Sequence, residues 1–286
     1  MTKYKDRVRK MTKKLNVVVT GCSSGIGAHC AARLKQDGYR VLVSARSDED
    51  LTRLVAAGFD AHYLEHHDAA SIDAFVDWAI AQCDGAIHGW FNNAGYAQPG
   101  AVEDLPVQAL RDQMEVNLFA YQHIMVRVIP VMRAQGHGRL INCSSVLGRI
   151  CVPWRAAYTA SKAALNALTM TLRQELYGSG VHASVIEPGA IPSNIAVNSV
   201  TYADKWIDAA NSVHGERYRK RLENLRSQKS PDDLSGAEPV YKALRHALTA
   251  KRPRAHYPVC KETHIAFMAM RLLPRDLCYR LFERAA

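Results

Sequence analysis

Short apolar runs alternate with stretches of helical periodicity along the first two thirds of the chain. Each run is rich in Val, Leu, Ile or Ala and is followed by glycine or polar residues, as buried strands are. The strands predicted in this way are 15–20, 40–45, 61–65, 86–91, 139–143 and 181–186. Between them apolar residues recur four apart, as at Ile26, Cys30 and Leu34, which predicts helices with one buried face. The predicted helices are one that ends at Gly38, 48–57, one capped by Asp68 or Ser71, 107–135 and 158–177.

This alternation determines the predicted fold class. Strands that alternate with helices and carry no hairpin signals form a parallel sheet covered on both faces. Right-handed crossovers then give a doubly wound, Rossmann-like α/β sheet. Such sheets bind ligands at the carboxyl ends of their strands, so the informative residues should directly follow each strand.

The alternation weakens in the last third of the chain. Residues 205–226 are helical in character but strongly charged, and we expect the insertion at about 192–238 to cover a substrate as a lid. A final strand over 253–260 and an apolar-rich helix over 264–273 follow, before Pro274. Because we find no repeat and no linker, we interpret 15–286 as one domain.

Composition excludes several classes of protein. The chain has 286 residues, 48% of them apolar, which excludes a disordered chain. No window approaches about 18 unbroken apolar residues, so a membrane-spanning helix is excluded, and the basic start lacks the apolar core of a secretory signal. Seven scattered cysteines without a C-x-x-C pair disfavour a disulfide framework or a zinc site and favour the cytoplasm.

The net charge of +10 is unevenly distributed. Residues 1–14 hold seven Lys or Arg and one Asp, so we expect a flexible basic tail rather than a nucleic-acid-binding surface. Met1 and Met11 are both candidate starts, because Met11 leads directly into the first strand. His62, His66 and His67 lie close in sequence, but a strand end explains them better than a metal site, and we expect no metal.

A glycine-rich turn joins the first strand to the first helix. Glycines let the backbone approach a ligand closely, and the free N–H groups of the helix start bind a pyrophosphate. The alternative is a tight turn without a ligand. The residues concerned are Gly21, Ser23, Ser24, Gly25, Ile26 and Gly27. Their spacing, G-x-x-x-G-x-G after Thr20, resembles the TGxxxGIG motif of the short-chain dehydrogenase/reductase family.

The end of the second strand bears on which nicotinamide cofactor fits. An acidic residue there binds a free ribose 2′-hydroxyl, whereas a 2′-phosphate needs a cation. Ala45 stands at the family's acidic position and Arg46 follows it, which favours NADP(H) over NAD(H) unless Arg46 is only a solvated surface residue. By resemblance, Glu65 stands where the family places an aspartate against the adenine, with His66 beside it.

Two further loops match family motifs. Asn92-Asn93-Ala94-Gly95 matches NNAG, which implies that the backbone at Asn92, Ala94 and Gly95 passes along the adenine-side ribose and that Asn93 ties neighbouring strands. An ordinary turn is the alternative. The segment 188–193 follows the sixth strand, and the resemblance implies that it binds the nicotinamide carboxamide. The residues implied there are Pro188, Gly189, Ile191 and Ser193, the last of which replaces the family's Thr.

Tyr158 and Lys162 lie four residues apart, so on a helix they share one face. A free phenol has a pKa of about 10 and is a poor base at neutral pH. Lowering the phenol pKa by about 3 units takes about 4 kcal/mol, which the Lys162 cation and an oxidised nicotinamide can together supply. Tyr158 then exchanges a proton with a substrate oxygen as hydride is transferred. A surface pair is the alternative.

Two more residues complete a match to the family's catalytic tetrad. Ser145 lies just past the fifth strand, where its hydroxyl can hold the same substrate oxygen. Asn117 lies in the long preceding helix, and the resemblance implies that it kinks the helix and holds a water that links to Lys162. Ser145 and Tyr158 are therefore the predicted substrate contacts.

These motifs predict an NADP(H)-dependent oxidoreductase that acts on a hydrophobic aldehyde, ketone or secondary alcohol. The alternative is a non-catalytic NADP-binding sensor or scaffold. More narrowly, the chain resembles bacterial NADP-dependent aldehyde reductases and the retinol and 17β-hydroxysteroid dehydrogenases, and family resemblance implies a homodimer or homotetramer. The arginine-containing apolar segment 264–282 fits either a peripheral membrane helix or, preferably, a helix over the substrate cleft or at a subunit interface.

Overall fold

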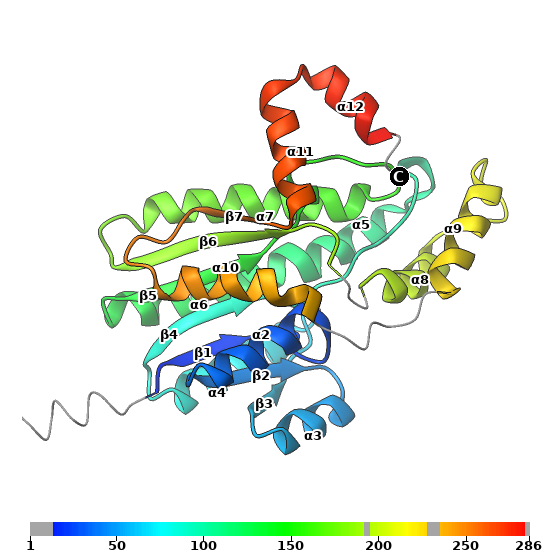
Figure 1. The fold of residues 1–286 in the computed structure, drawn as a ribbon. Helices are drawn as coiled ribbons and strands as arrows, with labels where there is room; N and C mark the ends of the chain where they lie inside the picture. The colour runs from blue at the N-terminus through cyan, green and yellow to red at the C-terminus, as the bar shows by residue number, and fades with distance from the viewer. Residues whose placement is uncertain (1–13, 192–194, 228–234, 284–286) are drawn as a thin grey trace, which may run out of the picture.

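A seven-stranded parallel sheet forms the centre of the protein (Figure 1). The computed structural model describes residues 14–191, 195–227 and 235–283. The sheet order is β3-β2-β1-β4-β5-β6-β7. The strands are β1 (Asn16–Val19), β2 (Arg40–Ala45), β3 (Asp60–Tyr63), β4 (Ile87–Asn92), β5 (Gly138–Cys143), β6 (Val181–Pro188) and β7 (His256–Val259). The order reverses between β1 and β4, so the predicted doubly wound α/β fold is confirmed.

Both faces of the sheet are covered, which explains why the strands are apolar without alternation. Val17 and Val19 pack against one layer and Val18 against the opposite layer, and all three are fully buried. The first layer consists of α2 (Gly25–Gln36), α3 (Asp48–Ala56) and α10 (Glu238–Thr249). The opposite layer consists of α4 (Ala69–Gln82), α6 (Ala120–Ala134) and α7 (Ala156–Glu175).

Most predicted elements are present with shifted ends. The third strand is Asp60–Tyr63 rather than 61–65, so Leu64 and Glu65 belong to the loop beyond it. The helix α10 was not predicted, although Val240, Tyr241 and Leu244 recur at helical spacing after Pro239 at its start. The prediction failed because the charged lid before it obscured the period.

The long helix predicted over 107–135 is interrupted. It consists of α5 (Val107–Met114), a π-helical turn η2 (Glu115–Phe119) and α6. A π turn inserts one extra residue into a helix and often marks a functional site. Pro130 lies inside α6 without ending it.

The described part of the segment predicted as a lid contains a pair of helices beyond the carboxyl ends of the strands (Figure 1). They are α8 (Ile195–Trp206) and α9 (Gly215–Ser227). The prediction of one helix over 205–226 is therefore wrong, because the chain is not helical between α8 and α9. Val200 and Ala203 of α8 pack on Leu222 and Leu225 of α9.

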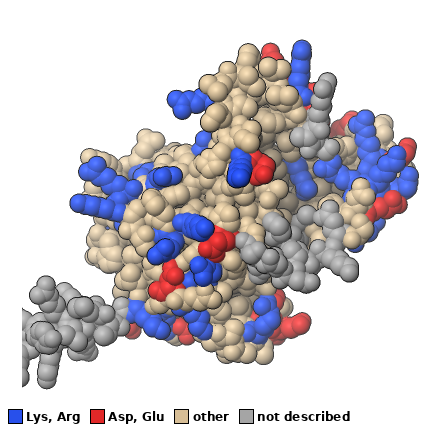
Figure 2. All heavy atoms as spheres, viewed as in Figure 1, with Lys and Arg blue, Asp and Glu red and all other residues tan. Residues whose placement is uncertain are grey.

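Basic side chains gather over these lid helices on the face that Figure 2 shows. Three of the α9 cations have acidic partners, since Arg219 pairs with Glu223, Lys220 with Glu216 and Arg226 with Asp204. The basic tail predicted at 1–14 lies, except for Lys14, outside the described residues.

The chain ends in a helical hairpin that projects from β7, made of α11 (Lys261–Leu272) and α12 (Arg275–Glu283) (Figure 1). The break at Pro274 agrees with the sequence prediction. Short helical turns η1 (Val102–Asp104), η3 (Val146–Gly148) and η4 (Ser235–Ala237) connect other elements. Among the described residues no helix combines the length and the apolarity needed to cross a bilayer.

Candidate active site

A cavity of about 500 Å³ opens where the carboxyl ends of the strands meet the lid. Many of the residues singled out from sequence line it: Gly21, Ser23, Ser24, Gly25, Ile26, Arg46, Glu65, His66, Ala94, Gly95, Ser145, Tyr158, Lys162 and Gly189. Pro188 and Ile191 line it as well. Gly27, Asn92 and Asn117 lie behind the wall, and Ser193 falls outside the described residues.

The conformation of the glycine turn lets a ligand come close to the backbone, because no side chain stands in the way. Gly21 and Gly25 have φ angles of +70° and +56°, which only glycine adopts without strain. A Cβ at Gly27 would lie 2.1 Å from the Gly21 carbonyl oxygen, so α2 packs directly on the turn. Within the described residues no side chain caps the start of α2 at Ser24. The N–H groups at a helix start without a side-chain cap fit a pyrophosphate.

Asn92 and Asn93 play different parts from one another. The fully buried Asn92 side chain donates to Asn142 Oδ1 at 2.9 Å and accepts from Trp90 Nε1 at 2.8 Å, so only the Asn92 backbone is left for the predicted ribose contact. Asn93 Nδ2 donates to the carbonyl oxygens of Thr20 and Gly21, at 3.1 and 3.2 Å. Asn93 therefore links the loop after β4 to the glycine turn, as predicted.

A cation and a carboxylate lie together at the end of the cavity beside β2. Arg46 is 60% exposed and its Nη1 lies 3.9 Å from Glu65 Oε2. Burial raises the pKa of Glu65, but the His67 amide and the Arg46 guanidinium outweigh burial and hold that pKa below its usual value. His66 is buried, which lowers its pKa to about 4, so its ring is neutral near pH 7. Its Nε2 has no hydrogen-bond partner among the described residues.

Tyr158 and Lys162 lie on the first two turns of α7, beside the end of β5. Lys162 Nζ donates to the Cys143 carbonyl oxygen at 2.8 Å and lies 5.7 Å from the centre of the Tyr158 ring. Burial lowers the pKa of Lys162 to about 8. Burial also raises the pKa of Tyr158 above its usual value, which the Ser145 hydroxyl and the Arg155 guanidinium only partly oppose. The lowered phenol pKa expected from sequence includes the charge of an oxidised nicotinamide, so it stays a prediction for the complex with cofactor.

Asn117 occupies the centre of the π turn, so the kink implied by family resemblance is present. Its Nδ2 donates to the Tyr96 carbonyl oxygen at 3.0 Å and to Ser161 Oγ at 3.2 Å, and its Oδ1 accepts from the Tyr96 N–H at 3.2 Å. A Cβ at Gly95 would lie 2.9 Å from Asn117 Oδ1. Asn117 therefore supports the cavity wall from behind.

Aromatic and aliphatic side chains form the part of the cavity under the lid. The rings of Tyr96 and Tyr202 stack with centres 3.9 Å apart and planes 22° apart. Ile195 and Tyr202 of α8 also line the cavity. Val116 and Asn198 also line it and were missed, although both are next to predicted elements of the site. Trp154 lies outside the cavity lining and packs edge-on against Tyr218 of α9, with ring centres 5.0 Å apart.

The fold and this cavity define a class: an oxidoreductase that binds a dinucleotide at the point where the strand order reverses. The short chain dehydrogenase family model matches residues 15–203. The chain therefore belongs to the short-chain dehydrogenase family and is a dehydrogenase or reductase.

Individual relatives agree with this assignment. The chain is 35% identical over 269 residues to the uncharacterized oxidoreductase YbbO of Escherichia coli (strain K12), covering 94% of each chain. It is 29% identical to retinol dehydrogenase 16 of Mus musculus over 95% of this chain and 89% of that chain. A solved actinorhodin polyketide ketoreductase with NADPH has a TM-score of 0.68 and 26% identity, over 87% of this chain and 97% of that chain.

Proposed function

We propose that this protein transfers a hydride between NADP(H) and a hydrophobic aldehyde, ketone or secondary alcohol, with Tyr158 as general acid and base. One observation carries the proposal. Ser145, Tyr158 and Lys162 line the same cavity as the glycine turn and Arg46. The proposed proton donor, the hydroxyl that would bind the substrate oxygen and the proposed dinucleotide-binding turn thus line the same cavity.

The cofactor assignment rests on which residues would hold each part. The glycine turn and the start of α2 would bind the pyrophosphate, and Glu65 and His66 would border the adenine. Arg46 is the cation for a 2′-phosphate, since its exposed guanidinium can form paired bonds to phosphate. Ala94 and Gly95 would follow the ribose, and Pro188, Gly189, Ile191 and Ser193 the nicotinamide. The NADPH complex of the related ketoreductase supports this assignment.

Residues of this chain would transfer the proton that the substrate oxygen gains in reduction and loses in oxidation. A bound nicotinamide dinucleotide supplies hydride in reduction and accepts it in oxidation. Tyr158 Oη donates its proton to the carbonyl oxygen in reduction and takes the hydroxyl proton in oxidation. Ser145 Oγ binds the same oxygen, which holds the reacting carbon in position. The Lys162 ammonium stabilises the phenolate, and Asn117 supports the loop at Tyr96 that lies beside it.

The substrate assignment rests on the cavity under the lid. Tyr96, Val116, Ile195 and Tyr202 offer aromatic and aliphatic surface there. Such a surface binds hydrophobic molecules, and a few polar groups fix their orientation. A retinol dehydrogenase among the relatives is consistent with a hydrophobic alcohol.

The test replaces Tyr158 with Phe, which removes only the phenol oxygen. Wild-type protein should oxidise NADPH with at least one member of a panel of aldehydes, ketones, steroids and retinoids. Y158F should lose about 10²- to 10⁴-fold in kcat, the usual contribution of general acid catalysis, while NADPH binding measured by fluorescence is unchanged. Full turnover by Y158F would rule out the proton-transfer role. NADPH binding without turnover of any panel member by the wild type would favour the sensor.

We also propose that the protein acts in the cytoplasm as a homodimer or homotetramer, with the α11–α12 hairpin at an interface between copies. Ile265, Met268 and Leu272 are 68%, 61% and 72% exposed, and more apolar side chains on the hairpin are exposed with them. Patches of this kind mark interaction surfaces. Within the described residues no residue of the hairpin lines the cavity, so covering the substrate does not explain them.

Light scattering of wild type and Leu272→Glu tests the interface. We expect a stable oligomer for the wild type and dissociation of the variant. A monomeric wild type that sediments with vesicles of phosphatidylcholine and phosphatidylglycerol would favour the membrane instead.

A further inference from the structure

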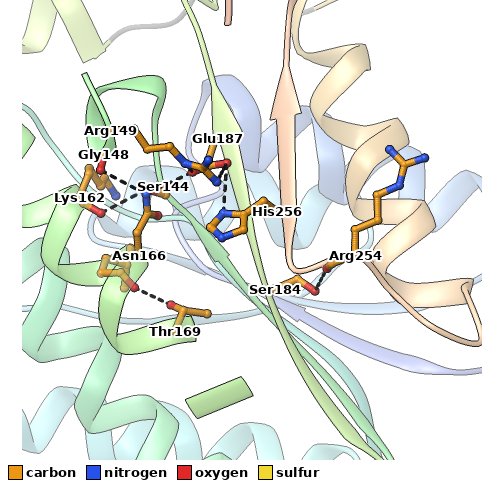
Figure 3. A network of polar contacts seen from close by, with 11 residues as sticks. Ser144, Gly148, Arg149, Lys162, Asn166, Thr169, Ser184, Glu187, Arg254 and His256 are labelled. Atoms are coloured by element: carbon orange, nitrogen blue, oxygen red, sulfur yellow. Dashed lines mark hydrogen bonds and ion pairs between the residues drawn. The ribbon is translucent and has the colours of Figure 1, made fainter. Parts of the chain in front are cut away.

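A fully buried carboxylate lies at the end of β6, directly before the Pro188-Gly189 wall of the cavity. Glu187 Oε1 accepts from Arg149 Nε at 2.6 Å and from Asn166 Nδ2 at 3.2 Å, and Oε2 accepts from Arg149 Nη2 at 3.0 Å. Figure 3 shows Arg149, Asn166 and His256 converging on this carboxylate. Paired bonds from one guanidinium fix both partners in orientation as well as in distance.

Two of these partners belong to elements that carry proposed catalytic residues. Arg149 follows η3, the turn that Ser145 caps through its Oγ, which accepts from the Leu147 N–H at 3.1 Å. Asn166 lies one turn beyond Lys162 on α7. The Glu187 carboxylate therefore connects the Ser145 turn and the Lys162 helix with the strand that leads to the nicotinamide-side wall.

The same contacts press the Ser145 turn onto α7. Asn166 Nδ2 also donates to the Gly148 carbonyl oxygen at 3.3 Å, and Ser144 Oγ donates to the Lys162 carbonyl oxygen at 3.4 Å. A Cβ at Gly148 would lie 2.6 Å from Asn166 Nδ2 and 3.0 Å from the Lys162 carbonyl oxygen. The turn and the helix are in direct contact with no room for a side chain between them.

The carboxylate has partners on its other side. His256 Nδ1 of β7 lies 3.3 Å from Glu187 Oε2, an ion-pair distance without hydrogen-bond geometry. The Arg149 guanidinium also stacks on Phe267 of α11, 4.6 Å from the ring centre. The network thus extends from the cavity wall to the C-terminal hairpin.

Stability alone does not require a charge at this position. Moving a carboxylate and a guanidinium out of water costs about as much as their attraction returns, and apolar residues of similar size often do as well. What a bidentate ion pair adds is a fixed geometry. Here the ion pair lies beside η3 and α7, and the distance between these two elements sets the Ser145–Tyr158 contact.

We propose that Glu187 is a positioning residue that, through Arg149 and Asn166, fixes Ser145 against Tyr158 and Lys162 at the nicotinamide-side wall. This inference rests on the proposed function, because it assigns Glu187 to the alignment of that same catalytic group. Glu187 itself does not line the cavity.

The test compares Glu187→Gln with wild type in alcohol oxidation by NADP⁺ across pH, with the alcohol of the most active panel carbonyl. The Ser145 hydroxyl favours the Tyr158 phenolate, so loosening the serine turn should move the basic rise of kcat to higher pH. We expect a shift of about 0.5 pH unit or more, a fall in kcat of about tenfold, and NADP⁺ affinity within about twofold of wild type.

A second readout does not depend on turnover. Difference ultraviolet titration of each protein against its Y158F version, both with NADP⁺ bound, follows the Tyr158 phenolate directly, and we expect the same upward shift in E187Q. Arg149→Lys keeps the charge of a partly exposed side chain but loses the paired geometry, so it should fold and show a smaller shift in the same direction. Glu187→Asp should restore part of the wild-type profile.

Ser184→Ala is the matched control. Ser184 is buried on the same strand, and its Oγ donates to the Arg254 carbonyl oxygen at 2.7 Å, away from the Ser145 turn (Figure 3). It should change melting temperature without moving the pH profile. Wild-type pH profiles in both E187Q and R149K would overturn the positioning role, even if both variants melt earlier. That result would leave the proposed function intact as long as Y158F is inactive, whereas an active Y158F would overturn the proposed function itself.

Discussion

The Lys162 ammonium donates a hydrogen bond to the carbonyl oxygen of Cys143, 2.8 Å away at the last residue of β5. This bond joins the helix that carries Tyr158 to the strand that leads to Ser145. The Lys162 side chain is 3% exposed, and burial holds its pKa near 8 instead of 10.5. The arrangement keeps a cation beside the phenol at a cost in stability that depends on pH.

That cost predicts how stability changes with pH. Below about pH 8 Lys162 is protonated in both the folded and the unfolded chain, so the folded chain bears the full cost of burying the charge. Between the folded pKa near 8 and the unfolded value of 10.5, only the folded chain loses the proton, so the free energy of unfolding rises with pH. From about pH 7.5 to 9.5 the expected gain is about 2 kcal/mol relative to Lys162→Met.

Urea denaturation of wild type and K162M at both pH values measures this difference without added cofactor. Lys242→Met, which removes an exposed lysine from α10, should keep the wild-type slope. If the free energy of unfolding changes equally with pH in wild type and K162M, Lys162 has the same pKa in the folded and the unfolded chain.

Gly27 should not tolerate a side chain. A Cβ there would lie 2.1 Å from the Gly21 carbonyl oxygen and 2.7 Å from Asn93 Nδ2, so Gly27→Ala must move α2 away from the glycine turn. We expect at least about a 100-fold loss of NADPH affinity, since the helix start would no longer reach the pyrophosphate. Fluorescence titration measures the affinity. Gly38→Ala, where open space surrounds the Cβ position despite a φ of +90°, controls for the loss of a glycine.

Arg46 should determine preference for NADPH over NADH. Arg46→Ala removes the exposed cation at the end of β2, so kcat/KM with NADPH should fall about 10- to 100-fold, the value of a charge-assisted phosphate contact. Activity with NADH should stay the same. Arg40→Ala, at the opposite end of the same strand and paired with Asp60, is the control. Equal losses with both cofactors would contradict a 2′-phosphate contact.

Comparing variants of Asn117 and Gln113 separates an effect on catalysis from an effect on stability. Gln113 is also buried and holds the same loop, accepting from the Gln98 N–H at 2.7 Å and donating to the Tyr96 carbonyl oxygen at 2.9 Å. Replacing either residue with Ala should cost about 2 kcal/mol in the free energy of unfolding, because buried groups lose partners.

Only Asn117→Ala should also lower kcat sharply, by about 100-fold, since the Asn117 side chain alone reaches Ser161 and the Gly95 wall beside Lys162. Equal kcat values for the two variants would show that the π turn matters only for stability.

The position of β1 and of its glycine turn could be predicted from sequence because each depends on local chemistry. Val17 to Val19 are apolar without alternation since both sheet faces are covered. The glycines at Gly21 and Gly25 stand where the backbone needs positive φ. Tyr158 and Lys162 share a helix face, so four residues of spacing were enough to place them together.

Asn92 and Tyr158 show what local reasoning leaves out. The NNAG motif implies a place for the Asn92 backbone, but it does not show that the side-chain amide pairs with Asn142, which is 50 residues away in the sequence. The phenol pKa depends on how deeply the ring is buried, and that depth depends on neighbours from other elements.

The amino-acid sequence alone determined the order of strands and helices from β1 to β6, the sheet edge that holds the site and most of the residues that face it. These follow from periodicity and from short motifs, whose physics acts over a few residues. The tertiary structure alone decided that Glu187 meets Arg149 and Asn166, and that Tyr96 stacks on Tyr202 of the lid. Such contacts join residues tens of positions apart, and only the packing of the folded chain brings them within reach.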